Sequence, residues 1–221
     1  MLIIAIPKSA STSLLKTLSE FYSSGGEQKF FHSEKKIPEN YSILGEFHSD
    51  VKDYLENEIS SFCEEGVFFK QHIPPTKVNL SLLRNRKKVI LLRKPIDIVL
   101  AYKRGSERGI HKNREAFDGC HTDQDWLVRA EKIGLMNELT HFHNTWLSEQ
   151  SDKMILTYEE LIEDADSCIK KVADYFGLEP KEGVVELKKY RYSGHSWMRS
   201  AIPRIVADVK SLIKKKFGNE G

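Results

Sequence analysis

Short runs of apolar residues alternate along the chain with longer stretches in which apolar residues recur every three or four positions. The short runs are typical of buried strands, and the recurring pattern is typical of helices. Strands are predicted at 2–6, 41–47, 67–70, 88–92 and 154–158. Helices are predicted at 14–22, 51–63, 96–102, 126–150 and 161–176, and an irregular loop at 105–125. Near-continuous apolar strands that alternate with helices favour a parallel sheet covered on both faces.

The fold class expected from this pattern is α/β, with a central and mainly parallel sheet of about five strands flanked by helices. The length of 221 residues suits a single domain over 1–221. The formal net charge of +2 provides no overall field that would select nucleic acid. The basic run at 214–216 is most simply the solvated face of a terminal helix, with a nucleic-acid or lipid patch as the alternative.

Three cysteines, Cys63, Cys120 and Cys168, are widely spaced along the chain. They fit neither a disulfide framework nor a zinc cluster, which indicates a reducing compartment. No apolar stretch approaches the ~18 residues that a transmembrane helix needs. We therefore expect a soluble, cytoplasmic protein without a membrane span, and the sequence does not indicate its oligomeric state.

The first strand ends at Pro7 and Lys8, and small or hydroxyl residues at 9–13 lead into the first helix. The free N–H groups and dipole of such a helix N-terminus attract phosphate. The loop of NTP-binding proteins, G-x-x-x-x-G-K-[ST], is absent because the lysine comes first and no glycine is present. From spacing alone, a phosphate site and an ordinary turn with a solvated lysine both remain open.

Polar side chains also stand at the ends of the other predicted strands. Lys70, Arg93 and Tyr158 each close a buried strand, as Lys8 does. The carboxyl ends of parallel strands lie at one edge of a sheet, where ligands bind in α/β proteins. We therefore expect these four side chains to share one site.

Four segments of the chain resemble the sequence motifs of a known enzyme family. Residues 7–13 resemble the P-K-[ST]-G-[ST]-[TS]-x loop of sulfotransferases that use 3′-phosphoadenosine-5′-phosphosulfate (PAPS). Residues 89–102 resemble the family's strand followed by R-[DNK]-P-x-D, and 154–180 resemble its Y-E-D-L…F-L-G-L segment. Residues 194–199 loosely resemble a C-terminal G-x-W-[RK] element. The resemblance implies a P-loop NTPase-like fold, PAPS as co-substrate without a metal, and a small-molecule or carbohydrate acceptor.

The resemblance also implies which residues bind the donor. Lys8 would stabilise the leaving oxygen, and donors aimed at developing charge are usually the largest catalytic contribution. The 5′-phosphate would be held by the loop residues Ser9, Ala10, Ser11, Thr12 and Ser13. Arg93 would grip the 3′-phosphate through its guanidinium, the alternative being a salt-bridged arginine at the sheet edge. Tyr158 would contact the adenine, the alternative being a core tyrosine, and Arg199 would contribute to cofactor binding.

The chain departs from the family pattern at several of these positions. Ala101 stands where a serine is expected to contact the 3′-phosphate, and Ser13 stands where many members have tryptophan. Ala10 stands where the loop pattern has glycine. Candidates to compensate for the missing serine are Lys94, Lys103, Arg104, Arg191 and Arg199.

A base for the acceptor hydroxyl is also implied. Residues 69–74 resemble the K-[TS]-H-[LF]-P segment of cytosolic members, in which the histidine is the base, so His72 would be catalytic and Lys70 would assist it. Glu27 is the rival, because 27–31 loosely resemble the E-x-x-F-F segment of heparan-type members. Five further histidines are most simply surface or substrate-cleft residues: His32, His48, His111, His121 and His195.

Three functions follow as hypotheses. The first is a PAPS-dependent sulfotransferase acting on a hydroxyl group. The second is a non-catalytic nucleotide-binding protein that retains the cleft, which Ala10 and Ala101 motivate. The third is a phosphoryl-transfer enzyme of related topology, disfavoured by the missing NTP-binding loop.

Overall fold

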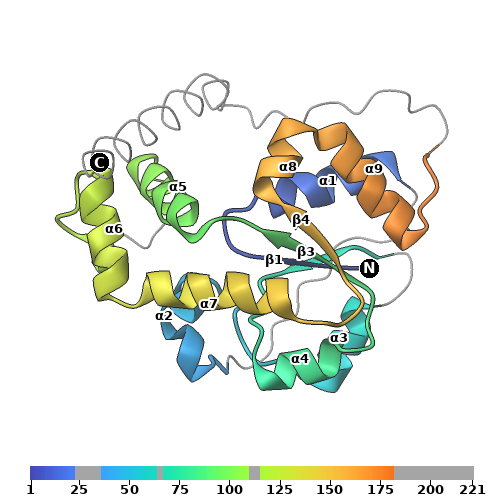
Figure 1. The fold of residues 1–221 in the computed structure, drawn as a ribbon, viewed down its shortest axis with the longest axis horizontal. Helices are drawn as coiled ribbons and strands as arrows, with labels where there is room; N and C mark the ends of the chain where they lie inside the picture. Colours follow the sequence, from blue (N-terminus) through green and yellow to red (C-terminus); the bar gives the residue numbers. More distant parts are fainter. Residues whose placement is uncertain (23–35, 64–66, 110–114, 182–221) are drawn as a thin grey trace, which may run out of the picture. The chain divides into compact units, whose positions relative to one another are not determined.

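A parallel sheet organises the chain (Figure 1). The computed structural model describes residues 1–22, 36–63, 67–109 and 115–181. Within them the sheet has four strands, all paired in parallel, in the order β2-β1-β3-β4. The strands are β1 (Leu2–Ala5), β2 (Phe69–Gln71), β3 (Lys88–Leu92) and β4 (Met154–Thr157).

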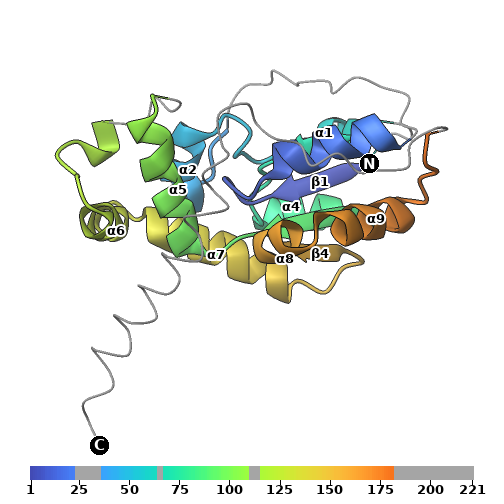
Figure 2. The ribbon, with the colours of Figure 1, turned by 90° about the horizontal axis from the view of Figure 1, so that it is seen from above.

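Helices cover both faces of this sheet (Figures 1 and 2). One face carries α1 (Ser11–Phe21), α8 (Tyr158–Glu163) and α9 (Ala165–Phe176). The opposite face carries α2 (Ser42–Phe47), α3 (Glu56–Phe62), α4 (Lys77–Leu83) and α7 (Leu135–Ser148). The apolar residues of α5 (Pro95–Glu107) and α6 (Asp123–Lys132) join the same cluster beyond the strand ends. Single 3-10 turns lie at Glu39–Tyr41 and Glu115–Phe117. No helix of the described ranges is both long and apolar enough to cross a bilayer.

The strand side chains alternate between two buried clusters. Ile3 and Val89 pack with α1 and α9, while Ile4 and Ile90 pack with the helices of the other face. Both faces are covered, so every position of β1 and β3 is buried. This is the reason that these strands are nearly continuous apolar runs. The predicted α/β class with a parallel sheet flanked by helices is confirmed.

The strand predicted at 41–47 is wrong: this segment is a 3-10 turn followed by α2. Apolar residues at 41, 43, 44 and 47 fit either period, and the structure buries Tyr41 and Leu44, three positions apart. The carboxylate of Glu138 on α7 decides the outcome, since it accepts the N–H groups of Ile43 at 2.9 Å and Leu44 at 2.7 Å. It thus caps a short helix that sequence periodicity does not reveal, and the described sheet has four strands where about five were predicted.

Other boundaries shift in ways that glycine and capping residues explain. The stretch 126–150 forms two helices because Gly134, with φ 87°, separates α6 from α7. Part of the predicted loop at 105–125 is helical: α5 continues to Glu107, and α6 begins at Asp123 behind the capping side chain of Thr122. In 51–63 the helix occupies Glu56–Phe62 alone.

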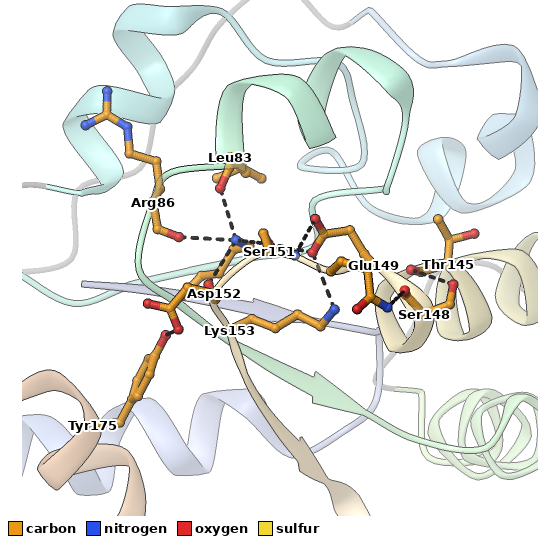
Figure 3. Close-up of polar contacts among 11 residues, drawn as sticks. Leu83, Arg86, Thr145, Ser148, Glu149, Ser151, Asp152, Lys153 and Tyr175 are labelled. Atoms are coloured by element: carbon orange, nitrogen blue, oxygen red, sulfur yellow. Dashed lines mark hydrogen bonds and ion pairs between the residues drawn. The ribbon is translucent and has the colours of Figure 1, made fainter.

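A buried lysine stands at the start of β3, at the edge of the sheet opposite the strand ends discussed below. The Lys88 ammonium donates to the carbonyl of Leu83 at 3.0 Å, to that of Arg86 at 3.2 Å, and to the Ser151 hydroxyl at 2.6 Å. Figure 3 shows Leu83, Arg86 and Ser151 converging there from α4, the turn after it and the loop before β4. These bonds compensate for burial of the charge and join the three segments.

Candidate active site

Three of the four candidate residues stand just beyond the carboxyl ends of strands, whereas Lys70 is the middle residue of its strand. Lys70 lies in β2, Lys8 follows β1, Arg93 directly follows β3, and Tyr158 directly follows β4. The helices that follow β1 and β3 join the clusters of opposite faces, because α1 packs in one cluster and α5 in the other. Lys8 and Arg93 therefore stand at a switch point of the sheet, where α/β proteins bind ligands.

The loop after β1 is held in an unusual conformation. Lys8 has φ 63° and Ala10 has φ 66°, so two residues that are not glycine lie in the left-handed region. The hydroxyl of buried Ser9 donates to the carbonyl of Ile6 at 2.7 Å and so closes the turn. Ser9 therefore contributes to the shape of the loop through its side chain.

The loop leaves backbone donors open at the start of α1. Ala10 precedes the helix and its methyl side chain provides no capping bond. The Ser13 N–H donates to the Ala10 carbonyl at 3.0 Å, whereas the N–H groups of 9–12 have no acceptor among the described residues. Ser11 is buried, Thr12 is exposed and Ser13 is half-buried. The set of open N–H donors is therefore 9–12, one residue shorter than the predicted 9–13.

Lys8 follows β1 and Lys70 lies in the neighbouring strand β2, and their charges influence each other. Burial, and then the charge of Lys70, lowers the pKa of Lys8 to about 8. The Lys8 ammonium also lies 5.1 Å from the ring centroid of Tyr102 on α5. A lysine with a lowered pKa beside a second lysine marks an electropositive position, which suits an anionic ligand.

Arg93 joins the loop to the last strand. Its Nη1 donates to the Lys8 carbonyl at 2.6 Å, and its guanidinium carbon lies 3.7 Å from the ring centroid of Tyr158. Burial lowers the pKa of Arg93, and its buried Nε has no hydrogen-bond partner in the described part of the chain. A buried guanidinium donor without a partner is expensive unless a ligand accepts it.

His72 is buried directly after β2, and its environment fixes its tautomer. Its Nδ1 lies 2.7 Å from the Ala5 carbonyl, which can only accept, so we assign the proton to Nδ1 and the lone pair to Nε2. Lys70 Nζ lies 3.4 Å from that Nε2. Burial lowers the pKa of His72 and the two lysines lower it further, although the charge of Asp50 opposes them. His72 is therefore neutral near pH 7, with a lone pair that can take up a proton.

Two neighbours of His72, Asp50 and His48, were not found from the sequence. The Asp50 carboxylate accepts the His72 backbone N–H at 2.8 Å, and the ring centroid of His48 lies 4.9 Å from that of His72. His48 Nε2 in turn lies 2.6 Å from the hydroxyl of Tyr102. The spacing of His48 and Asp50 is a weak signal, and nothing in the sequence indicates that they meet His72.

His48, Asp50 and His72 are also the described group whose ligand atoms lie close enough to hold a metal, within 4.8 Å of one another. A cation at this point would face the Lys70 ammonium, which lies 3.4 Å from His72 Nε2, and the charge of Lys8 beyond it. Like charges at such distances repel, so the residues present fit a hydrogen-bonded network better than a metal centre.

The remaining candidates are placed as follows. Tyr158 is half-buried and stacks on Arg93 rather than joining the core clusters. Ala101 is half-buried on α5, and Lys103 forms ion pairs with Asp123 at 2.8 Å and Glu107 at 3.2 Å. Several predicted residues lie outside the described part of the chain: the base Glu27, the cofactor-binding Arg199, and also Arg191 and the segment 194–199.

Several solved structures of sulfotransferases and a retinol dehydratase are similar to this chain. A sulfotransferase from Alicyclobacillus acidocaldarius is 14% identical, with 100% of this chain and 96% of that chain covered and a TM-score of 0.47. Mouse sulfotransferase SULT7A1 complexed with PAP is 15% identical, with 82% and 59% covered and a TM-score of 0.49. Retinol dehydratase in a complex with retinol and PAP is 15% identical, with 85% and 61% covered and a TM-score of 0.43. The chain thus spans about three fifths of the latter two.

A search of the curated proteins found no match to this chain. The family model of the sulfotransferase domain, in contrast, matches residues 1–196, which is most of the 221. This match includes the loop at 7–13, the strand and arginine at 89–102, and the segment at 154–180. It confirms the resemblance that those motifs indicated: this chain belongs to the sulfotransferase domain family.

Proposed function

We propose that this sulfotransferase takes its sulfuryl group from PAPS and transfers it to a hydroxyl group of a small molecule or carbohydrate. The observation that carries the proposal is the buried Arg93 Nε without a partner, next to the loop whose N–H groups at 9–12 are open. A nucleotide with separate 5′- and 3′-phosphates matches two groups of anion donors that lie side by side.

PAPS, when bound, supplies a sulfuryl group on a phosphosulfate anhydride. In our proposal the N–H groups of 9–12 and the hydroxyls of Ser11, Thr12 and Ser13 bind its 5′-phosphate. Arg93 binds the 3′-phosphate through Nε, while its bond to the Lys8 carbonyl keeps the guanidinium next to the loop. Tyr158, already stacked on Arg93, contacts the adenine. Arg199 adds a further contact to the nucleotide.

Lys8 stabilises the oxygen that departs with the nucleotide. Its pKa of about 8 keeps it mostly protonated at neutral pH, and an anionic donor nearby raises that pKa further. A donor preorganised where charge develops typically contributes about 2.7–4 kcal/mol. Lys70, on the adjacent strand β2, would assist in stabilising charge near the sulfuryl group.

His72 acts as the base. As the acceptor oxygen bonds to sulfur, the hydroxyl proton moves to Nε2 of His72, and the bond from sulfur to the nucleotide oxygen breaks. The bond from Nδ1–H to the Ala5 carbonyl holds the ring so that Nε2 carries the lone pair. Glu27 remains the alternative base.

Ligand binding tests the proposed donor. The product nucleotide, 3′-phosphoadenosine-5′-phosphate (PAP), should raise the melting temperature more than ATP does at equal concentration. A clear preference for ATP would contradict the proposal. Binding of PAP without transfer from labelled PAPS to any hydroxyl acceptor in a broad panel would instead favour the non-catalytic nucleotide-binding protein.

Matched substitutions test the two roles. Lys8→Ala and His72→Ala should abolish transfer and leave the fold intact, as judged by circular dichroism. Lys77→Ala and His121→Ala are the controls, because they change the same residue types at exposed positions. If His72→Ala retains activity and Glu27→Ala loses it, the assignment of the base is wrong.

A further inference from the structure

A structured turn brings a carboxylate to the back of His72. The turn runs from His48 to Val51, immediately after α2, and the Val51 N–H donates to the His48 carbonyl at 3.0 Å. The hydroxyl of buried Tyr54 donates to the Asp50 carbonyl at 2.8 Å. These bonds fix the backbone of Asp50. The fixed backbone in turn holds the Asp50 carboxylate next to the backbone N–H of His72.

Two different groups of the chain hold His72. The Ala5 carbonyl accepts the ring Nδ1–H and sets the tautomer, whereas the Asp50 carboxylate accepts the backbone N–H. In a serine–histidine–aspartate triad one carboxylate orients the ring and also stabilises its positive charge. Here the orienting contact comes from a neutral carbonyl, so the negative charge near the ring is provided separately.

We propose that Asp50 is a positioning residue for His72: its carboxylate anchors the end of β2 and stabilises the imidazolium that forms when His72 takes up the acceptor proton. The inference rests on the proposed function, in which His72 is the base. It adds to that function a residue that does not touch the substrate and acts through its charge.

The charges around His72 explain why such a group is needed. The titratable groups that face it are Asp50 and His48 from the α2–α3 turn, Lys70 from β2 and Lys8 from the loop after β1, with Tyr102 of α5 behind His48. Both lysines oppose a positive imidazole, and among these groups Asp50 is the one that favours it. Burial raises the pKa of Asp50, but the charge that His72 gains on protonation, the charge of Lys70 and the backbone N–H groups that the carboxylate accepts outweigh it and keep this pKa below the ordinary value.

Asparagine at position 50 separates charge from structure. Its side-chain oxygen can still accept the His72 N–H, but the negative charge is lost. The pKa of His72 then falls further, so the acidic limb of the pH profile of kcat/KM moves to lower pH. Because a weaker base accepts the proton less readily, kcat falls by roughly tenfold, part of the ~10²–10⁴ that a general base contributes.

The controls use neighbouring positions. Asp53→Asn alters the same residue type three positions on, where the carboxylate accepts the Thr76 hydroxyl and does not contact His72. Asp53→Asn should leave both kcat and the acidic limb of the pH profile of kcat/KM unchanged. Asp50→Glu retains the charge and should keep the limb nearer to that of the wild type than Asp50→Asn does.

A titration of the histidines by NMR tests the inference without any turnover. The His72 signal, assigned as the one that His72→Ala removes, should titrate at a lower pH in Asp50→Asn than in the wild type. An unchanged or higher midpoint would overturn the role of Asp50 even if the enzyme is active. Failure of the proposed function would appear differently, as absence of PAP binding or of transfer in the wild type. If Asp50→Asn does not fold, the same titration on Asp50→Ser, which also removes the charge, decides: a lower His72 midpoint is expected, and an unchanged or higher one overturns the role of Asp50.

Discussion

Ala10→Gly should stabilise the protein, although it removes a methyl group from a half-buried position. Ala10 has φ 66° at the start of α1, in a loop where the sulfotransferase pattern has glycine. A residue with a Cβ atom carries a penalty of about 1–2 kcal/mol in this region because Cβ approaches the carbonyl oxygen too closely. Glycine does not carry that penalty.

The net effect is smaller, since glycine also favours the unfolded chain by about 0.4–1 kcal/mol. Ala10 packs at the border of the cluster that α1 and α9 form, and loss of this contact reduces the gain further. We therefore expect an increase of about 0.5 kcal/mol in the free energy of unfolding. Ala101→Gly is the matched control: it lies inside α5, where the same change should lower the free energy by about 0.5–1 kcal/mol.

Urea denaturation of the two variants and the wild type measures both effects. The midpoint should rise for Ala10→Gly and fall for Ala101→Gly, with an unchanged slope in each case. The two substitutions thus change the free energy of unfolding in opposite directions, and the two variants differ by about 1–1.5 kcal/mol. If both variants lose stability by the same amount, the left-handed conformation at Ala10 carries no strain and the reasoning is refuted.

The other predictions concern charge. Since protonated Lys8 is the active form, kcat/KM should decline as the pH rises through about 8, and Lys70→Gln should move this decline to higher pH because it removes a charge that lowers the Lys8 pKa. Arg93→Lys loses the bond to the loop and the stacking on Tyr158, so the Kd for PAP in calorimetry should rise roughly tenfold to a hundredfold. Lys88→Met leaves buried oxygens without a donor and should lower the free energy of unfolding by about 2 kcal/mol, with PAP affinity unchanged because it lies at the opposite edge of the sheet.

The sequence was sufficient for the layers of the fold because strands buried on both faces must be apolar throughout. The run 88–92 therefore coincides with β3, Lys88–Leu92. It was not sufficient for 41–47, because the group that caps α2 is Glu138, which is 95 positions away from Ile43. A short apolar run fits a strand or a helix equally well until such a distant contact decides.

The candidate site shows the same division. Lys8, Arg93 and Tyr158 could be placed together from the sequence, because the carboxyl ends of parallel strands share an edge whatever the helices do. Asp50 and His48 could not, because they reach His72 only through the way α2 ends and packs, and the sequence pattern had assigned that segment to a strand. Contacts set by topology are predictable from pattern, whereas contacts set by packing are not.

The free protein carries several unfavourable features at one edge of its sheet. Lys8 and Ala10 are left-handed, the pKa of Lys8 is lowered by burial and by Lys70, and Arg93 Nε is buried without a partner among the described residues. The last two are electrostatic and would be relieved by the same event, the arrival of an anion. Stability and ligand binding are therefore linked here: a ligand with two phosphates should stabilise the chain more than one with a single phosphate, because it satisfies the loop and Arg93 together.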